Sequence, residues 1–423
     1  MDGKRQDFLR FGVAGMGVGA SSVLTPIACS PFSGLGAGAD IDPSVRARFS
    51  AAYPQARVYA SVEDMCADPG LDAIWISTPN RLHADHAVMA ARAGKHIIIS
   101  KPMTTTLKDA ERMIEAADRA GVRLIAGHSL GFGPAIRAMA SLGAAGSDLG
   151  SIKAIQMMAF TDWMLLPRVE EEVAPELGGG LVHRQSPHQI DAARLLGGGR
   201  VRSVRAQVGQ WMPERRGPGF FSAFLEFESG TVATVSHNGF GYLVGPEIVP
   251  WGSDAGISGK PIAARADARR RLSDPSYDEG AAKHEMRLGG AAPLFSQQPA
   301  AKPWVPLHLG LTVVSYERGD VRHAPDGLFV YAQDRRSHLI VPDEAMLGLS
   351  ELEELYGAVR LGAPLYRDGA WGMATLEVGL AIMESARSRS EILMHHQTPV
   401  RPGAYGAPPQ ISDKTKDGAH AFS

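Results

Sequence analysis

Three glycines near the start of the chain directly follow a short apolar run. Residues 9–14 lead into Gly-Met-Gly-Val-Gly-Ala at residues 15–20, which matches the pattern G-x-G-x-x-A, and a helical stretch follows to about residue 28. After a strand, Gly15 permits a tight turn, Gly17 allows a pyrophosphate to approach the backbone, and Ala20 lets helix and strand pack closely. This context predicts a dinucleotide site, whereas the glycines alone would fit an ordinary turn. The predicted contact residues are Gly15, Met16, Gly17, Val18 and Ala20.

An aspartate ends the second apolar run. Asp40 follows residues 35–39, at about the spacing where a carboxylate accepts the ribose hydroxyls of a bound dinucleotide. This carboxylate would also repel a 2′-phosphate by roughly 4 kcal/mol, for unit charges ~4 Å apart at an effective dielectric of ~20. We therefore predict NAD as the cofactor in preference to NADP. Asp42 is the alternative ligand, and both aspartates could instead be turn residues ahead of Pro43.

Short apolar runs alternate with helical segments in the first third of the chain. This alternation is typical of an α/β fold with a doubly wound parallel sheet. The segment 107–120 has helical spacing and stops at Gly121, so it is expected to be a crossover helix. We predict a Rossmann domain over residues 1–130. Its strands are expected at residues 9–14, 35–39, 73–77, 96–99 and 122–126.

Longer strands are expected beyond residue 150, which predicts a second, α+β domain over residues 131–400. The runs 220–227 and 231–237 flank the turn Ser229-Gly230 and predict an antiparallel hairpin in a large, open, mostly antiparallel sheet. We read residues 252–303 as an irregular, mobile insertion and residues 401–423 as a disordered tail. The other strands are expected at residues 152–160 and 201–211, and two helices at residues 344–361 and 370–389.

The composition is that of a globular enzyme with no general affinity for nucleic acid or membranes. Lys and Arg number 43 and Asp and Glu 45, so the formal charge is −2; no overall attraction to polyanions follows. The two cysteines suit a reducing compartment. No secretory apolar core opens the chain and no run approaches the ~20 apolar residues of a membrane span, so we expect a cytoplasmic protein. The histidine pairs lack zinc-ligand spacing, and we expect no metal.

Three further motifs complete a family resemblance. Residues 77–80 read Ser-Thr-Pro-Asn with His83 following, residues 93–96 read Ala-Gly-Lys-His, and residues 100–102 read Ser-Lys-Pro. With the glycine turn, they resemble the Gfo/Idh/MocA oxidoreductases, which typically read T-P-N-x-x-H, A-G-K-H and E-K-P. Ser100 stands where the family usually has Glu. The resemblance implies that these residues bind the cofactor: Thr78, Pro79, Asn80, His83 and Lys101.

The same resemblance assigns the chemical step to a lysine and a histidine. Family members place the lysine of the E-K-P motif, here Lys101, where nicotinamide and substrate meet. The triple glycine at residues 178–180, followed by His188 and Asp191, resembles the segment that lies under the substrate. We therefore expect Lys101 to be the general base, His188 to orient the hydroxyl or share the proton, and Asp191 to bind the substrate. A surface lysine and a packed core histidine are the alternatives.

An arginine replaces the aspartate that many members carry in this segment. Arg184 would add positive charge beside Lys101 and an oxidised nicotinamide, which favours neutral lysine and an anionic substrate. Since a guanidinium can hold a carboxylate through two hydrogen bonds, Arg184 is the leading carboxylate ligand, with Arg137 and Arg168 as weaker candidates. A structural salt bridge is the alternative role for Arg184.

The segments around Arg184, Thr161-Asp162-Trp163 and residues 370–377 narrow the resemblance to the branch that oxidises phthalate 4,5-cis-dihydrodiol. The implied reaction yields 4,5-dihydroxyphthalate, with a carboxylated small molecule as the substrate. Dehydrogenation of a carboxylated muconate semialdehyde or of a sugar or inositol remains open, and so do an NAD-dependent glycosidase and a non-catalytic cofactor-binding protein. Family members also suggest a homodimer or homotetramer formed through the exposed face of the second sheet.

Overall fold

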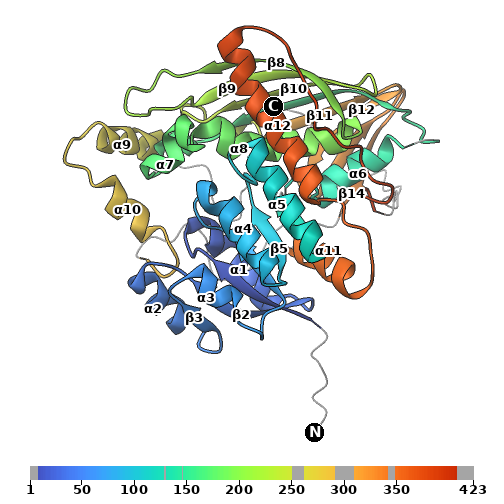
Figure 1. The fold of residues 1–423 in the computed structure, drawn as a ribbon. Coiled ribbons are helices and arrows are strands. Elements are labelled where there is room, and N and C mark those ends of the chain that lie inside the picture. Colours follow the sequence, from blue (N-terminus) through green and yellow to red (C-terminus); the bar gives the residue numbers. More distant parts are fainter. Residues whose placement is uncertain are drawn as a thin grey trace.

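Two sheets organise the chain, as the computed structural model shows (Figure 1). The structure describes residues 8–127, 130–144, 146–249, 262–290, 309–341 and 348–406. The first sheet has six parallel strands in the order β3-β2-β1-β4-β5-β6. This is the Rossmann order, in which the strand sequence reverses beside β1 and leaves a crevice at the carboxyl ends of β1 and β4. The predicted α/β fold with a doubly wound sheet is confirmed.

The Rossmann elements agree closely with those expected from the sequence. The strand β3 was not predicted, because its three residues lie at the sheet edge and carry no continuous apolar run. The strands are β1 (Leu9–Ala14), β2 (Ser33–Ala39), β3 (Arg57–Tyr59), β4 (Ala73–Ile76), β5 (His96–Ser100) and β6 (Leu124–Gly127). The helices are α1 (Val18–Cys29), α2 (Pro43–Ala52), α3 (Val62–Cys66), η1 (Asn80–Leu82), α4 (His83–Arg92) and α5 (Leu107–Ala120).

The second sheet has nine strands in the order β14-β13-β12-β11-β7-β10-β9-β8-β15. All neighbouring pairs are antiparallel except β7 with β10, and the predicted hairpin between β9 and β10 is confirmed. The strands are β7 (Ile152–Phe160), β8 (Val201–Gly209), β9 (Phe220–Phe227), β10 (Val232–Asn238), β11 (Leu311–Tyr316), β12 (Gly319–Ala324), β13 (Gly327–Tyr331), β14 (Arg336–Ile340) and β15 (Ile392–Leu393).

Helices that follow the Rossmann strands pack on the second sheet, as α8 and α12 do, and α11 and α12 also contact the first domain. The helix α11 packs Leu352 and Leu355 into the same cluster as Leu9 and Phe11, so the C-terminal part completes the Rossmann core. Among the described residues, no helix is long and apolar enough to cross a membrane. The helices are α6 (Pro134–Leu142), η2 (Trp163–Leu165), α7 (Glu170–Val173), η3 (Pro175–Leu177), α8 (Gly180–Gly197), η4 (Gly245–Glu247), α11 (Leu349–Arg360) and α12 (Gly369–Ser388).

The expected irregular insertion contains two helices in its described part. They are α9 (Ile262–Leu272) and α10 (Glu279–Glu285). The sequence pattern did not reveal α9, because this helix is held by arginines and has no apolar stripe. Arg265, which is buried, donates to the carbonyls of Gly241 and Leu243. The prediction of irregular structure was therefore wrong for residues 262–272 and 279–285. Residues 252–261 and 291–303 lie outside the described residues, as do residues 407–423 of the expected disordered tail.

Helices α8 and α12 are joined by a polar network at the centre of the second domain. Arg194 is fully buried, donates to the carbonyl of Trp371 and the hydroxyl of Thr375, and lies over the Trp371 ring. Burial lowers the pKa of Arg194 to about 10, while the charge of Asp191 acts in the opposite direction. The guanidinium therefore stabilises the buried carboxylate of Asp191 as well as linking the helices.

We predict that Arg194→Met lowers the free energy of unfolding by about 3–5 kcal/mol, because buried acceptors on Gly199, Trp371 and Thr375 lose their donor and the nearby charge of Asp191 loses a favourable interaction. Urea denaturation measures the change. The matched control is Arg200→Met, since Arg200 is half exposed and pairs with Glu228 at 3.3 Å, an arrangement worth about 0–1 kcal/mol. Equal losses in the two variants would contradict this account.

Candidate active site

The glycine turn has the geometry expected of a dinucleotide site. Gly15 has φ of +79°, and a Cβ there would lie 2.8 Å from the Thr78 Cα atom, so both the turn and the neighbouring loop require glycine. A Cβ on Gly17 would meet nothing within 4 Å, and no side chain caps the start of α1. Open space therefore faces a helix N-terminus, which is where a pyrophosphate binds. The residues present fit a dinucleotide.

Asp40 lies beside this turn at the carboxyl end of β2. Its Oδ2 atom accepts a hydrogen bond from the backbone of Met16 at 2.8 Å, and its Oδ1 atom accepts one from the backbone of Asp42 at 3.0 Å. The Met16 side chain is buried, so this residue contributes its backbone to the turn. Because a carboxylate oxygen has two acceptor sites, Asp40 keeps acceptor capacity for a ribose. Asp42 instead caps α2 through Ser44.

A buried histidine, His83, holds the loop that carries the Thr-Pro-Asn motif. His83 is 1% exposed; its Nε2 atom lies 2.7 Å from the carbonyl oxygen of Thr78 and its Nδ1 atom 3.1 Å from that of Pro102. Burial lowers the pKa of His83 to about 4. His83 thus ties two loops together and does not present its side chain to a dinucleotide, unlike the sequence expectation. Asn80 donates to the carbonyl of Gly178, which joins this loop to the start of α8.

Lys101 reaches from the end of β5 to the second domain. Its ammonium donates to the backbone carbonyl of Arg184 at 2.5 Å. The charge of Lys101 acts on His237, a fully buried histidine of β10 whose pKa is lowered to about 3, mainly by burial. Ser100, which replaces the usual glutamate, bonds the hydroxyl of Ser77 and the indole of Trp75 inside the first domain. Lys101 is therefore the side chain of this motif that crosses between the domains.

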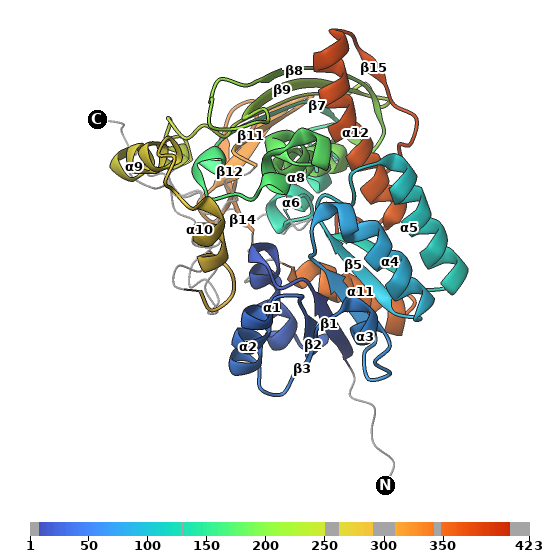
Figure 2. The same ribbon diagram turned by 60° about the vertical axis from the view of Figure 1, so that its left-hand side comes forward.

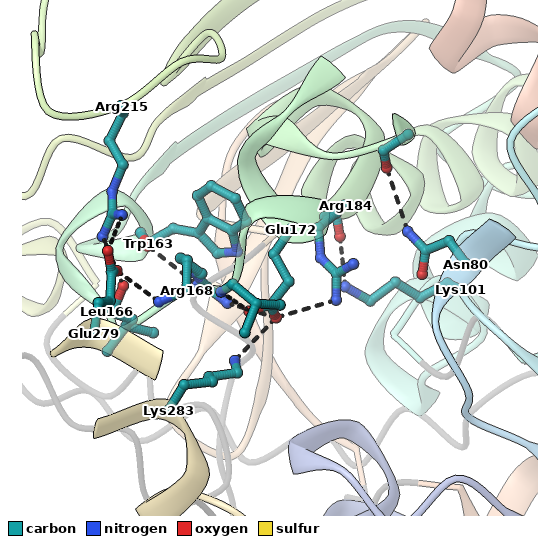
Figure 3. A network of polar contacts seen from close by, with 12 residues as sticks. Asn80, Lys101, Trp163, Leu166, Arg168, Glu172, Arg184, Arg215, Glu279 and Lys283 are labelled. Atoms are coloured by element: carbon teal, nitrogen blue, oxygen red, sulfur yellow. Dashed lines mark hydrogen bonds and ion pairs between the residues drawn. The ribbon is translucent and has the colours of Figure 1, made fainter. Parts of the chain in front are cut away.

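One carboxylate gathers three cationic side chains next to Lys101 (Figure 3). The Oε1 atom of Glu172 lies 2.9 Å from the Lys283 ammonium, 3.4 Å from the Arg184 guanidinium and 3.5 Å from that of Arg168. The other oxygen accepts a bond from the backbone of Val169. We call these four side chains, Glu172, Arg168, Arg184 and Lys283, the Glu172 cluster. It carries two positive charges in excess.

The charges of the Glu172 cluster shift one another's ionisation. Burial opposes the charged form of Glu172, but the charges of Arg168, Arg184 and Lys283 outweigh it and lower the pKa to about 2. Burial lowers the pKa of Lys283 to about 8, assisted by the charge of Arg168 and opposed by Glu172. Glu172 is thus ionised at neutral pH, and the excess of positive charge is held in a largely water-excluded place.

The expected carboxylate ligand Arg184 is held in part by this acid. Its side chain is 25% exposed, so it lies at the surface of the cluster, whereas Arg168 is 8% exposed and stacks over the Trp163 ring at 4.0 Å. His188 lies one turn further along α8 than Arg184 and is buried. Residues four apart share a helix face, so α8 presents Arg184 and His188 on one side.

Two predicted substrate ligands lie away from the cluster. Asp191 is fully buried and accepts bonds from the indole of Trp371 at 2.5 Å and the hydroxyl of Thr375 at 3.2 Å. The Arg137 guanidinium lies against Gly406. Asp191 is therefore part of the α8–α12 joint, and Arg137 supports the C-terminal segment. The predicted segment forms α8, and its aspartate is turned into the protein.

Three side chains of the site were missed from the sequence. Glu172 ends a run of three glutamates that carried no chemical motif, and Lys283 lies in the insertion that was read as irregular. His237, whose Nε2 atom lies 2.9 Å from the Thr161 hydroxyl, occupies an alternating strand and gave no signal. The segment Thr161-Asp162-Trp163, one of the motifs of the family resemblance, indicates that this part of the chain is near the site, because Thr161 contacts His237.

The fold and this site define an oxidoreductase with a dinucleotide-binding domain. Residues 9–128 match the family model described as "Oxidoreductase family, NAD-binding Rossmann fold", and residues 136–248 match the "GFO/IDH/MocA C-terminal domain". The chain therefore belongs to the Gfo/Idh/MocA oxidoreductases, as its motifs predicted.

Similar proteins include one that matches nearly the whole chain. A 1-carboxy-3-chloro-3,4-dihydroxycyclohexa-1,5-diene dehydrogenase of Comamonas testosteroni is 32% identical over 383 residues, 90% of this chain and 95% of that protein. A solved structure from Bordetella bronchiseptica RB50 is 30% identical with a TM-score of 0.83, covering 92% of this chain and all of the other. A levoglucosan dehydrogenase structure, 19% identical with a TM-score of 0.66 over 91% of this chain and 99% of its own, shares the fold. The likeness to the first relative supports oxidation of a CH–OH group.

We predict that Glu172→Gln lowers the free energy of unfolding at pH 7 by about 3–5 kcal/mol, because buried cations lose their counter-charge. The folded-state pKa of about 2 lies below the ordinary value of 4.5. The ionised Glu172 therefore contributes its full share of the free energy of unfolding above about pH 4.5, and this share is lost as the pH falls toward 2. The difference in the free energy of unfolding between wild type and Glu172→Gln should therefore narrow in acid.

The neighbouring glutamate provides the control. Glu171 forms an exposed pair with Arg81 at 2.6 Å, so Glu171→Gln is expected to change the free energy of unfolding by at most about 1 kcal/mol. Denaturation curves that are identical for Glu172→Gln and Glu171→Gln, or a gap between wild type and Glu172→Gln that widens in acid, would refute the assigned role of Glu172.

Proposed function

We propose that this protein is an NAD-dependent dehydrogenase of a carboxylated cis-dihydrodiol, and that its substrate is phthalate 4,5-cis-dihydrodiol, which becomes 4,5-dihydroxyphthalate. The observation that carries the proposal is the Glu172 cluster, whose four side chains hold two positive charges in excess beside Lys101. A carboxylated ring would find both an anion site and a base there. The relative from Comamonas testosteroni acts, by its name, on a carboxylated dihydroxy-cyclohexadiene.

The proposed cofactor fits the first domain. The turn at Gly15 and Gly17 would receive the pyrophosphate at the start of α1, and Asp40 would accept the ribose hydroxyls. The carboxylate of Asp40 favours NAD, because it would repel a 2′-phosphate. NAD⁺ bound by these residues would supply the hydride acceptor for oxidation of the substrate's carbinol carbon.

The chain's own residues would handle the proton and the orientation. Lys101, held at the domain junction by the Arg184 carbonyl, would take the proton from the hydroxyl oxygen as hydride leaves the carbon that bears this hydroxyl. The ketone that forms then enolises to the aromatic diol. Arg184 would hold a ring carboxylate through its partly exposed guanidinium. His188, on the same side of α8, would orient the hydroxyl.

We further propose that the protein forms a homodimer or homotetramer through the outward face of the second sheet. Met158 of β7 and Phe224 of β9 are 39% and 42% exposed on this face. Large exposed apolar side chains on an open sheet support an interface.

We predict that Lys101→Met slows NADH formation from the dihydrodiol by about 10²–10⁴-fold, the usual contribution of a general base, while NAD still binds. Single-turnover absorbance at saturating NAD measures the step. The control is Lys153→Met, since Lys153 is exposed and pairs with Glu317 on the second sheet. Undiminished turnover in Lys101→Met would remove this lysine from the proton transfer.

The substrate class is tested by following NADH with a panel. We expect NADH from phthalate cis-dihydrodiol, with NAD preferred to NADP, and little from inositol or glucose, because neither offers a carboxylate to the Glu172 cluster. A carboxylated muconate semialdehyde tests the nearest alternative. Preference for the polyols would contradict the proposal, and release of sugar from a glycoside without net NADH would indicate a glycosidase.

A further inference from the structure

Residues 279–288 connect two places that lie in different domains. We call this segment the strap; it comprises α10 and the turn that follows it, and α10 lies above α2 in both views (Figures 1 and 2). Toward the second domain, Lys283 contacts Glu172 at 2.9 Å with its side chain 9% exposed. The next residue, His284, faces the Rossmann domain. Adjacent residues of a helix point in different directions, so one short helix contacts both domains.

The strap is anchored at the cofactor end of the first domain. The Nε2 atom of His284 lies 3.1 Å from the Arg48 guanidinium, and its Nδ1 atom lies 3.6 Å from Asp42. Arg287 lies 3.6 Å from the same carboxylate, and Leu288 is buried in the cluster that contains the Rossmann core. Asp42 follows Asp40 by two residues, so this anchor adjoins the proposed ribose site. The strap therefore spans from the cofactor end to the Glu172 cluster.

The Glu172 cluster has the charge of a site for a further anion. Among the described residues, Glu172 is the one carboxylate paired with these three cations, of which Arg168 and Lys283 are buried. The Nε atom of Arg168 is buried and finds no hydrogen-bond acceptor among the described residues. Buried cations are costly unless they are paired and hydrogen-bonded. An incoming carboxylate would supply the missing charge and acceptors.

We infer that Lys283 is a ligand for a carboxylate of the substrate, and that the docking of the strap on Asp42 holds it in place for a dianionic ring with two neighbouring carboxylates. The inference rests on the proposed function and deepens it, because it names the residue that would bind the second carboxylate and the contact that would hold this residue in place. Arg184 holds one carboxylate and Lys283 the other, with Arg168 behind them. Lys283 is thus a specificity residue carried by the insertion.

The ligand role is tested by the binding of a non-reacting probe. Calorimetry of the NAD-loaded protein gives its affinity for phthalate and for benzoate, and the ratio of the two measures how much the second carboxylate contributes to binding. A lost hydrogen bond to a charged group weakens binding at least tenfold. We expect Lys283→Met to weaken phthalate binding by at least tenfold and benzoate binding much less, and Lys283→Arg to retain most of the affinity. Lys153→Met is the exposed control.

The docking role is tested at the other end of the strap. Arg287→Met removes a contact with Asp42 without touching the Glu172 cluster, and we expect it to weaken phthalate binding severalfold. The effects of substitutions at coupled residues do not add. The double variant with Lys283→Met and Arg287→Met should therefore bind phthalate no more weakly than Lys283→Met alone. The control is Arg270→Met, because Arg270 is exposed on α9 and pairs within its own helix.

The pH dependence separates a ligand from a packing residue. The groups that face Lys283 are Glu172, Arg168 and Arg184, and its pKa is lowered to about 8 while Glu172 stays ionised. Phthalate affinity of the wild type should fall as the pH rises through about 8, when the ammonium loses its proton. The fall should be absent in Lys283→Met and should move to higher pH in Lys283→Arg.

The outcomes distinguish the two proposals. Phthalate affinity that is unchanged in Lys283→Met, or equal for phthalate and benzoate in the wild type, overturns the inference whatever the enzyme oxidises. Tight phthalate binding that depends on Lys283, without NADH formation from any carboxylated diol, supports the inference and overturns the proposed reaction instead.

Discussion

The contact of Glu172 with three cations is the interaction on which the rest of the site depends. Its carboxylate joins Arg168, which precedes α7, Arg184 on α8 and Lys283 on α10. A single acid cannot neutralise three cations, so the structure stores an excess of positive charge where water is largely excluded. Electrostatic attraction is stronger in such a place than in water. The excess of positive charge is therefore local, since the whole chain carries a formal charge of −2.

One backbone atom links the Glu172 cluster to Lys101, the proposed base. The carbonyl of Arg184 accepts the Lys101 ammonium, while the side chain of Arg184 faces Glu172. The proposed base and the proposed anion site are consequently both held by Arg184, in the first half of α8. Asn80, which bonds Gly178 just before this helix, adds a second tie between the domains. A substrate held by its carboxylate would thus be held at a set distance from Lys101.

The sequence predicted the fold and the cofactor turn well, because these depend on local patterns. The runs at residues 9–14, 152–160 and 220–227 became strands with the expected bounds. The substrate site was predicted only in part. Lys283 and Glu172 meet through contacts between residues 111 positions apart, which no local pattern reveals. Asp191 was misassigned because a motif gives a residue's place in the chain and not the direction of its side chain.

The most direct test is a crystal structure of the protein with NAD and 4,5-dihydroxyphthalate. The account predicts one ring carboxylate on Arg184, the other on Lys283, and a ring hydroxyl within about 3.2 Å of the Lys101 Nζ atom, which is hydrogen-bond reach for a base. A ring bound with its carboxylates away from the Glu172 cluster, or Lys101 turned away from the hydroxyls, would contradict it.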